Sequence, residues 1–121
     1  MAKTQNEQHL YNKLLITQAL NYQKLGYTNI KINNKNYIHG QPVKVGGYIP
    51  DLSAVFDTET VLCEVVLSDI MNDPKILERW RTISRSGFDF HMITPKKNLN
   101  EVKDLVKQNG INVDKFWYSK Y

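Results

Sequence analysis

One glutamate in the middle of an apolar run constrains this chain more than any other feature. Residues 61–67 read Val-Leu-Cys-Glu-Val-Val-Leu, so Glu64 is the only charged residue among six apolar neighbours. A short continuous apolar run of this kind predicts a strand that is buried on both faces. A carboxylate in such a strand is strongly unfavourable unless something pairs with it. Glu64 therefore requires a cation, a hydrogen-bond network or a metal ion.

A second carboxylate is expected opposite this strand. The apolar content of residues 48–56 predicts the preceding strand, and residues 57–60 predict a tight polar turn between the two strands. Strands joined by a short loop pair at equal distances from it, which places Asp51 roughly opposite residues 64–66. Two carboxylates there could hold Mg²⁺ or Mn²⁺, with the backbone carbonyl of Val65 as a third ligand. Such a metal could activate a water molecule for phosphodiester hydrolysis.

Each of these residues also has a simpler interpretation. Asp51 follows Pro50 and fits an ordinary turn or strand-edge acid. Glu64 fits a buried ion pair with an Arg or Lys from a neighbouring helix. Both interpretations remain open at this point.

Other residue types that often carry chemistry give weaker signals. The histidines lack the short spacing of a zinc site, and we expect surface or strand-edge imidazoles. Cys63 is expected to be a buried small hydrophobe, and Trp80 a core residue. The histidines are His9, His39 and His91.

The remaining pattern alternates helices and strands. Helical spacing, caps and glycine stops predict helices over 5–25, 74–86 and 99–109, the last with Asn98 and Glu101 as a capping box. Strands are predicted over 28–33, 37–39, 48–56, 61–67, 88–93 and 111–117. Helical crossovers favour parallel pairing of the last strands. The predicted fold class is α/β, a three-layer α/β/α sandwich with a mixed central sheet, in one domain spanning residues 1–121.

A family resemblance follows from two short stretches. Gly47-Tyr48-Ile49-Pro50-Asp51, followed by Glu64-Val65-Val66, resembles the P-D…(D/E)-x-K signature of the restriction-endonuclease-like nuclease superfamily. The helix before these strands and the crossover helix after them are also similar to that superfamily's core. The resemblance implies a restriction-endonuclease-like core and a metal-dependent nuclease that hydrolyses DNA. It assigns Asp51, Glu64 and the Val65 carbonyl to Mg²⁺ or Mn²⁺.

The sequence departs from the family where its lysine should stand. Val66 occupies that position, and in the family this lysine helps to orient the attacking water. Lys75 and Arg79, which share one helix face, are candidate catalytic replacements, as is Lys44, with ordinary solvated charges as the alternative. The stretch from Glu64 to Asp69 also looks like the E-V-E-T-x-D stretch of superfamily members that lack the lysine. The alternative function is therefore a catalytically inactive nuclease-fold domain that serves DNA or protein binding.

Members of that superfamily often supply a further acid from the first helix. Glu7 is the only acid in the predicted first helix, but it lies near the helix start, earlier than such an acid usually falls. An acid in a first turn also complements the helix dipole. We therefore favour the dipole role over a role in the site.

Charge and hydropathy set the expected partners and location. Sixteen Lys and Arg against twelve Asp and Glu leave a formal charge of +4, which favours polyanionic partners such as DNA. Without an apolar run of about 18 residues or a signal-peptide core, a cytoplasmic protein with no membrane partner is expected. The aromatic residues of 116–121 could stack on single-stranded bases, but packing or a homodimer contact is favoured.

Overall fold

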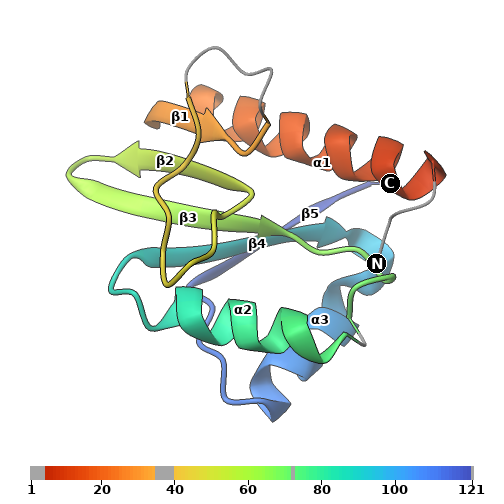
Figure 1. Cartoon of the computed structure of the whole chain (residues 1–121). Helices are drawn as coiled ribbons and strands as arrows, with labels where there is room; N and C mark the ends of the chain where they lie inside the picture. The colour runs from red at the N-terminus through yellow and green to blue at the C-terminus, as the bar shows by residue number, and fades with distance from the viewer. Residues whose placement is uncertain (1–4, 35–39, 72, 121) are drawn as a thin grey trace.

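The fold is a mixed sheet with three α-helices around it. The computed structural model describes residues 5–34, 40–71 and 73–120 (Figure 1). Its elements in chain order are α1 (Gln5–Lys24), β1 (Thr28–Ile32), β2 (Leu52–Phe56), β3 (Glu59–Val65), α2 (Pro74–Ser84), β4 (Asp89–Pro95), a short 3-10 turn (Lys96–Asn98), α3 (Leu99–Gln108) and β5 (Lys115–Ser119). The predicted α/β class is confirmed.

The sheet has the order β1-β2-β3-β4-β5, with β3 in its centre. Strands β1, β2 and β3 pair antiparallel, with Leu52 opposite Cys63. Strands β3, β4 and β5 pair parallel, with Cys63 opposite His91. The tight turn at Asp57 allows the antiparallel pair, whereas the crossovers through α2 and α3 return the chain in the same direction. The predicted parallel pairing of the last strands is confirmed.

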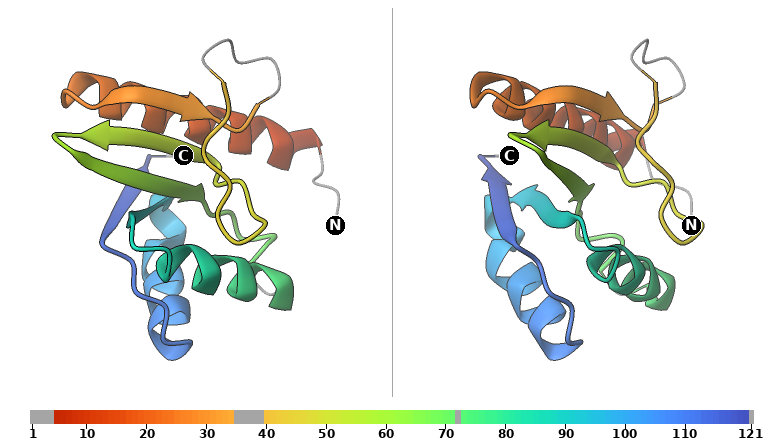
Figure 2. Two further views of the ribbon diagram at one scale, coloured as in Figure 1. Left: turned by 60° about the vertical axis from the view of Figure 1, so that its left-hand side comes forward. Right: turned by 90° about the vertical axis from the view of Figure 1, so that its left-hand side faces the viewer.

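Alternate residues of β3, together with Val66, which follows it, pack in two separate apolar clusters. Val61, Cys63 and Val65 pack in a cluster with Leu14, Leu15 and Tyr22 of α1. Leu62 and Val66 pack in a second cluster with residues of α2 and α3, including Trp80 and Val102. Figures 1 and 2 show α1 on one side of the sheet and α2 with α3 on the other. The period of two along a strand explains this division.

Both helices begin where predicted, α2 at Pro74 and α3 at Leu99, but only α2 has the predicted cap. Asp73 caps α2, because its side chain accepts a hydrogen bond of 3.0 Å from the Lys75 backbone N–H. Asn98 makes no side-chain cap, and its backbone is already helical after the 3-10 turn. The predicted capping box at α3 is therefore wrong.

Some strand boundaries also differ. Strand β2 begins at Leu52, because Tyr48 instead pairs with Val45 in a local bridge that turns through Gly46 and Gly47. Strand β5 begins at Lys115 rather than at residue 111. The predicted strand 37–39 lies outside the described residues, and β1 pairs with β2. In the described segments no helix combines the length and apolar character that a membrane span needs.

Candidate functional site

The two acids singled out in the sequence meet where β2 begins and β3 ends. The Asp51 backbone N–H donates a hydrogen bond of 2.9 Å to Glu64 Oε2. The Val65 backbone N–H donates one of 2.8 Å to Asp51 Oδ2. This placement follows from the register, since the neighbouring pair is Leu52 opposite Cys63. The predicted approach of Asp51 to Glu64 is confirmed.

Arg79 supplies the cation that Glu64 requires. Its Nε donates a hydrogen bond to Glu64 Oε1, and its Nη2 donates one of 3.1 Å to Glu64 Oε2. The same Nη2 lies 3.9 Å from Asp51 Oδ1. Glu64 is 1% exposed, so this is a buried ion pair with a partly exposed arginine. Arg79 is on α2, one turn after Lys75, whose side chain is exposed at the helix start.

Tyr11 of α1 completes the group, and the sequence interpretation did not include it. Its hydroxyl donates a hydrogen bond of 2.5 Å to Asp51 Oδ1. From the sequence, Glu7 of this helix was expected to complement the helix dipole rather than to join the site, and the residue that reaches Asp51 is Tyr11, one turn later. In the sequence, Tyr11 stood out only as one of the apolar and aromatic residues at helical spacing in the predicted first helix. We call Tyr11, Asp51, Glu64 and Arg79 the acidic cluster.

The electrostatics of the acidic cluster are those of a buried, coupled group. Burial and the neighbouring Asp51 charge raise the pKa of Glu64 above its ordinary value, and the hydrogen bonds and charge of Arg79 oppose this shift. Burial lowers the pKa of Arg79, but the hydrogen bond and charge of Glu64 outweigh it and raise that pKa overall. Burial and Asp51 also raise the pKa of Tyr11, which keeps its hydroxyl a hydrogen-bond donor.

The loop before β2 covers the acidic cluster and is held by the same arginine. Arg79 Nη2 donates a hydrogen bond of 2.7 Å to the carbonyl of Ile49, and its guanidinium lies 5.7 Å from the centre of the Tyr48 ring. Gly46 lies so close to α2 that a Cβ there would be 2.3 Å from Thr82 Cγ2. The loop is therefore packed against α2, and Arg79 joins loop, helix and strand.

The carboxylate oxygens that a divalent metal would use are hydrogen-bonded to protein donors in this arrangement. Each carboxylate oxygen of Asp51 and Glu64 already accepts a hydrogen bond from Tyr11, Arg79 or a backbone N–H. Across the described segments, no three His, Cys, Asp or Glu side chains gather in a group that could hold a metal ion. A metal would have to displace Arg79, which contacts both oxygens of Glu64. The two acids that were predicted as metal ligands are thus hydrogen-bonded to other groups of the protein.

The position of the missing lysine belongs to the core. Val66 is fully buried and packs in the second cluster with Leu62 and Trp80. A lysine there would put its ammonium group among apolar side chains. Among the described residues, neither the Lys44 nor the Lys75 side chain makes an ion pair with Asp51 or Glu64. Of the three candidate replacements, the structure brings only Arg79 to the acids.

His91 differs from the sequence expectation of a surface or strand-edge imidazole. It is 5% exposed, and its Nδ1 lies 2.7 Å from the Tyr22 hydroxyl and accepts a hydrogen bond of 3.1 Å from Trp117 Nε1. Burial and the Lys115 charge lower the pKa of His91 to about 4. We call Tyr22, His91 and Trp117 the imidazole cluster. His9 is exposed, and His39 lies outside the described residues.

Cys63 and Trp80 behave as predicted. Both are fully buried, and burial raises the pKa of the Cys63 thiol, which keeps it protonated. Neither residue offers a reactive group to solvent.

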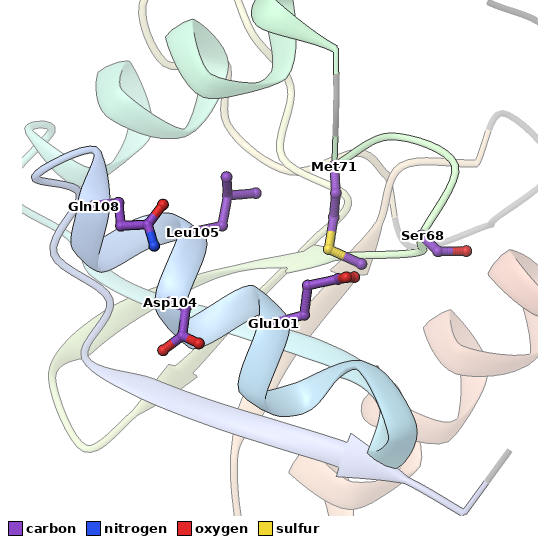
Figure 3. Close-up of a pocket in the computed structure, with 6 residues that line it drawn as sticks. All are labelled: Ser68, Met71, Glu101, Asp104, Leu105 and Gln108. Carbon is purple, nitrogen blue, oxygen red and sulfur yellow. The ribbon is translucent and has the colours of Figure 1, made fainter.

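A separate pocket of about 590 Å³ lies between α3 and the segment that follows β3 (Figure 3). Glu101 and Asp104 line it together with Ser68 and Met71, and none of the residues of the acidic cluster does. Because its charged lining residues are acids, this pocket is unsuited to a phosphate.

Comparison with known proteins adds no assignment. No family model, no curated protein and no solved structure matches this chain. The function must be argued from the site alone.

Proposed function

We propose that this chain has the restriction-endonuclease-like core, as a three-layer α/β/α sandwich. The support is the order of elements, with a helix, three antiparallel strands, a crossover helix and a parallel strand. Asp51 and Glu64 stand at the ends of neighbouring strands, as the acids of that superfamily's signature would.

For the function, we propose a non-catalytic domain of this type that binds DNA. One observation carries this proposal: Arg79 contacts both oxygens of Glu64 and also holds the covering loop through Ile49. The oxygens that would hold a metal are thereby used to join β3, α2 and the loop. The acidic cluster acts as a structural ion pair, and the formal charge of +4 favours a polyanionic ligand.

A second candidate is the metal-dependent nuclease that the resemblance implies. One observation favours it, which is that Arg79 lies beside both acids, where a substitute for the lysine would be needed. In that case Arg79 would have to leave Glu64 before Mg²⁺ or Mn²⁺ could bind to Asp51 and Glu64. The two candidates therefore differ in whether the ion pair opens.

Calorimetric titration of the purified protein with Mn²⁺, together with a cleavage and binding assay on DNA oligonucleotides, separates the candidates. A structural ion pair predicts no saturable Mn²⁺ binding, no cleavage, and DNA binding in low salt. The variant Arg79→Gln frees the Glu64 oxygens and should bind Mn²⁺ more tightly than the wild type. The matched control Lys75→Gln removes an exposed charge from the same helix and should behave like the wild type.

Two results would overturn the proposal. Mn²⁺-dependent cleavage that is lost in Asp51→Asn and Glu64→Gln would establish the nuclease instead. A wild-type protein that binds neither Mn²⁺ nor DNA would leave a protein-interaction domain as the remaining interpretation.

A further inference from the structure

The edge strand β5 carries a run of aromatic residues that are each approached by a lysine. Lys103 Nζ lies 5.6 Å from the centre of the Phe116 ring, and Lys96 Nζ lies 5.9 Å from that of Tyr118. Lys115 Nζ lies 4.2 Å from the centre of the Trp117 ring. These distances are within the range of cation–π attraction. The ammonium groups are thus held beside the rings on both faces of β5.

The aromatic edge is open to solvent. Strand β5 is the last in the sheet order, so only β4 pairs with it among the described residues. Figure 2 shows β5 along one margin of the molecule, beside α3. Tyr118 is 54% exposed, and Phe116 and Trp117 are partly exposed. The three lysines that approach the rings are exposed as well.

Most of the net positive charge of the chain is concentrated here. Residues 96–120 contain six lysines and three acids, a net charge of +3 within a chain of +4. Of the acids, Glu101 and Asp104 line the pocket beside Ser68 and Met71 (Figure 3). Asp114 accepts a hydrogen bond of 2.8 Å from the Phe90 backbone N–H. Two of the acids thus face a pocket and the third bonds to the backbone of β4, whereas three of the lysines each approach an aromatic ring of β5.

We propose that the open edge of β5 binds a single-stranded polynucleotide. Lys96, Lys103 and Lys115 would neutralise its phosphates, and a base would stack on the exposed ring of Tyr118. A single strand fits better than a duplex, because only unpaired bases can turn a ring face toward the protein. This inference rests on the proposed function in assuming a nucleic acid ligand, and it names the surface and the form of that ligand.

Charge and stacking can be tested separately with fluorescent oligonucleotides of deoxythymidine and of uridine, measured by anisotropy over a salt series. The triple variant K96Q/K103Q/K115Q should lose about ten-fold or more in affinity at low salt, with a salt slope shallower by about two. The matched triple variant K24Q/K44Q/K75Q removes the same charge from exposed positions elsewhere and should lose much less.

Stacking is tested at Tyr118. The variant Tyr118→Ala should lose about ten-fold in affinity, whereas Phe88→Ala, which removes another exposed aromatic ring, should not. Binding should also quench the fluorescence of Trp117. This is measured in a Trp80→Phe background, because the fully buried Trp80 would otherwise add fluorescence that does not respond to the ligand. Equal affinities for the deoxy and ribo strands would indicate recognition through phosphate and base faces. A preference for one of the two would identify the sugar as a further contact.

The possible failures are distinguishable. Equal losses in the two triple variants, unchanged binding by Tyr118→Ala, or equally tight binding of polyglutamate would overturn the β5 surface and leave the proposed function standing. Mn²⁺-dependent cleavage of the oligonucleotide would overturn the proposed function and leave the β5 surface standing. A wild-type protein that binds no polynucleotide would overturn both.

Discussion

The acidic cluster and the imidazole cluster place titratable groups in the same buried sheet and treat their charge in opposite ways. Both use a tyrosine from α1, Tyr11 in one and Tyr22 in the other. In the acidic cluster Arg79 compensates the charge of Glu64 through two hydrogen bonds. In the imidazole cluster, Tyr22 and Trp117 converge on one nitrogen of His91, and its lowered pKa keeps the ring neutral.

The difference shows which solution each environment permits. Glu64 lies within reach of a partly exposed arginine, so an ion pair can form with only one partner fully buried. His91 lies beneath α1 beside an aromatic strand, where a positive charge would also meet Lys115. A neutral imidazole is the lower-energy state there, because burial and the Lys115 charge disfavour its protonation. The stability of the acidic cluster therefore depends on Arg79, whereas that of the imidazole cluster depends on His91 remaining uncharged.

The largest effect is expected from breaking the ion pair. Arg79→Met leaves Glu64 buried without a cation and should lower the free energy of unfolding by about 3–5 kcal/mol in urea denaturation at pH 7. The double variant Glu64→Leu with Arg79→Met should recover part of this loss, because no buried charge remains.

Lys75→Met is the control for that variant, since Lys75 is exposed on the same helix. It should change stability by no more than about 0.5 kcal/mol. If Arg79→Met lowered the free energy of unfolding by less than about 1 kcal/mol, Arg79 would not be the principal partner of Glu64.

The next effect is a pH dependence that comes from His91. Its pKa is about 4 when folded against 6.5 ordinarily, so the unfolded chain binds more protons between these values. Stability should therefore fall as pH is lowered from about 6.5 to about 4. His91→Gln retains an acceptor but does not titrate, and its thermal melts over this range should lack that part of the fall.

Glu64 provides the contrasting slope. Burial raises its pKa in the folded chain above the ordinary 4.5, so above that pH the folded chain binds more protons than the unfolded chain. Its contribution to stability should decrease as pH rises above about 4.5. Glu64→Gln should remove this slope and leave that of His91 intact. If His91→Gln and Glu64→Gln showed the same dependence of stability on pH, the two clusters would not titrate independently.

The smallest effects distinguish the two tyrosines. Tyr11→Phe removes a hydrogen bond to a carboxylate and should cost about 2 kcal/mol in urea denaturation, whereas Tyr22→Phe removes one to a neutral imidazole and should cost about 1 kcal/mol. Both replacements keep the ring, so the difference reports on the acceptor. A smaller loss in Tyr11→Phe than in Tyr22→Phe would mean that the other contacts of Asp51 stabilise its charge without the Tyr11 hydroxyl.

Much of the local structure could be predicted because it depends on neighbouring residues. The apolar run around Glu64 predicted β3, and Asp73-Pro74 predicted the start of α2 from capping chemistry alone. The start of β5 was misplaced, because Ile111 packs in the core as part of a connection rather than as a strand. An apolar residue reports burial, and pairing with β4 decided where the strand begins.

The sequence by itself determined that Glu64 needs a partner and that Asp51 lies beside it, because a buried charge and a short turn allow few alternatives. Only the tertiary structure decided that the partner is Arg79, that Tyr11 joins the group, and that His91 is buried rather than at the surface. Those contacts join residues 15 to 69 positions apart in the chain. The packing of α1 and α2 on the sheet selects among several candidate cations and hydroxyl groups, and no local pattern records that choice.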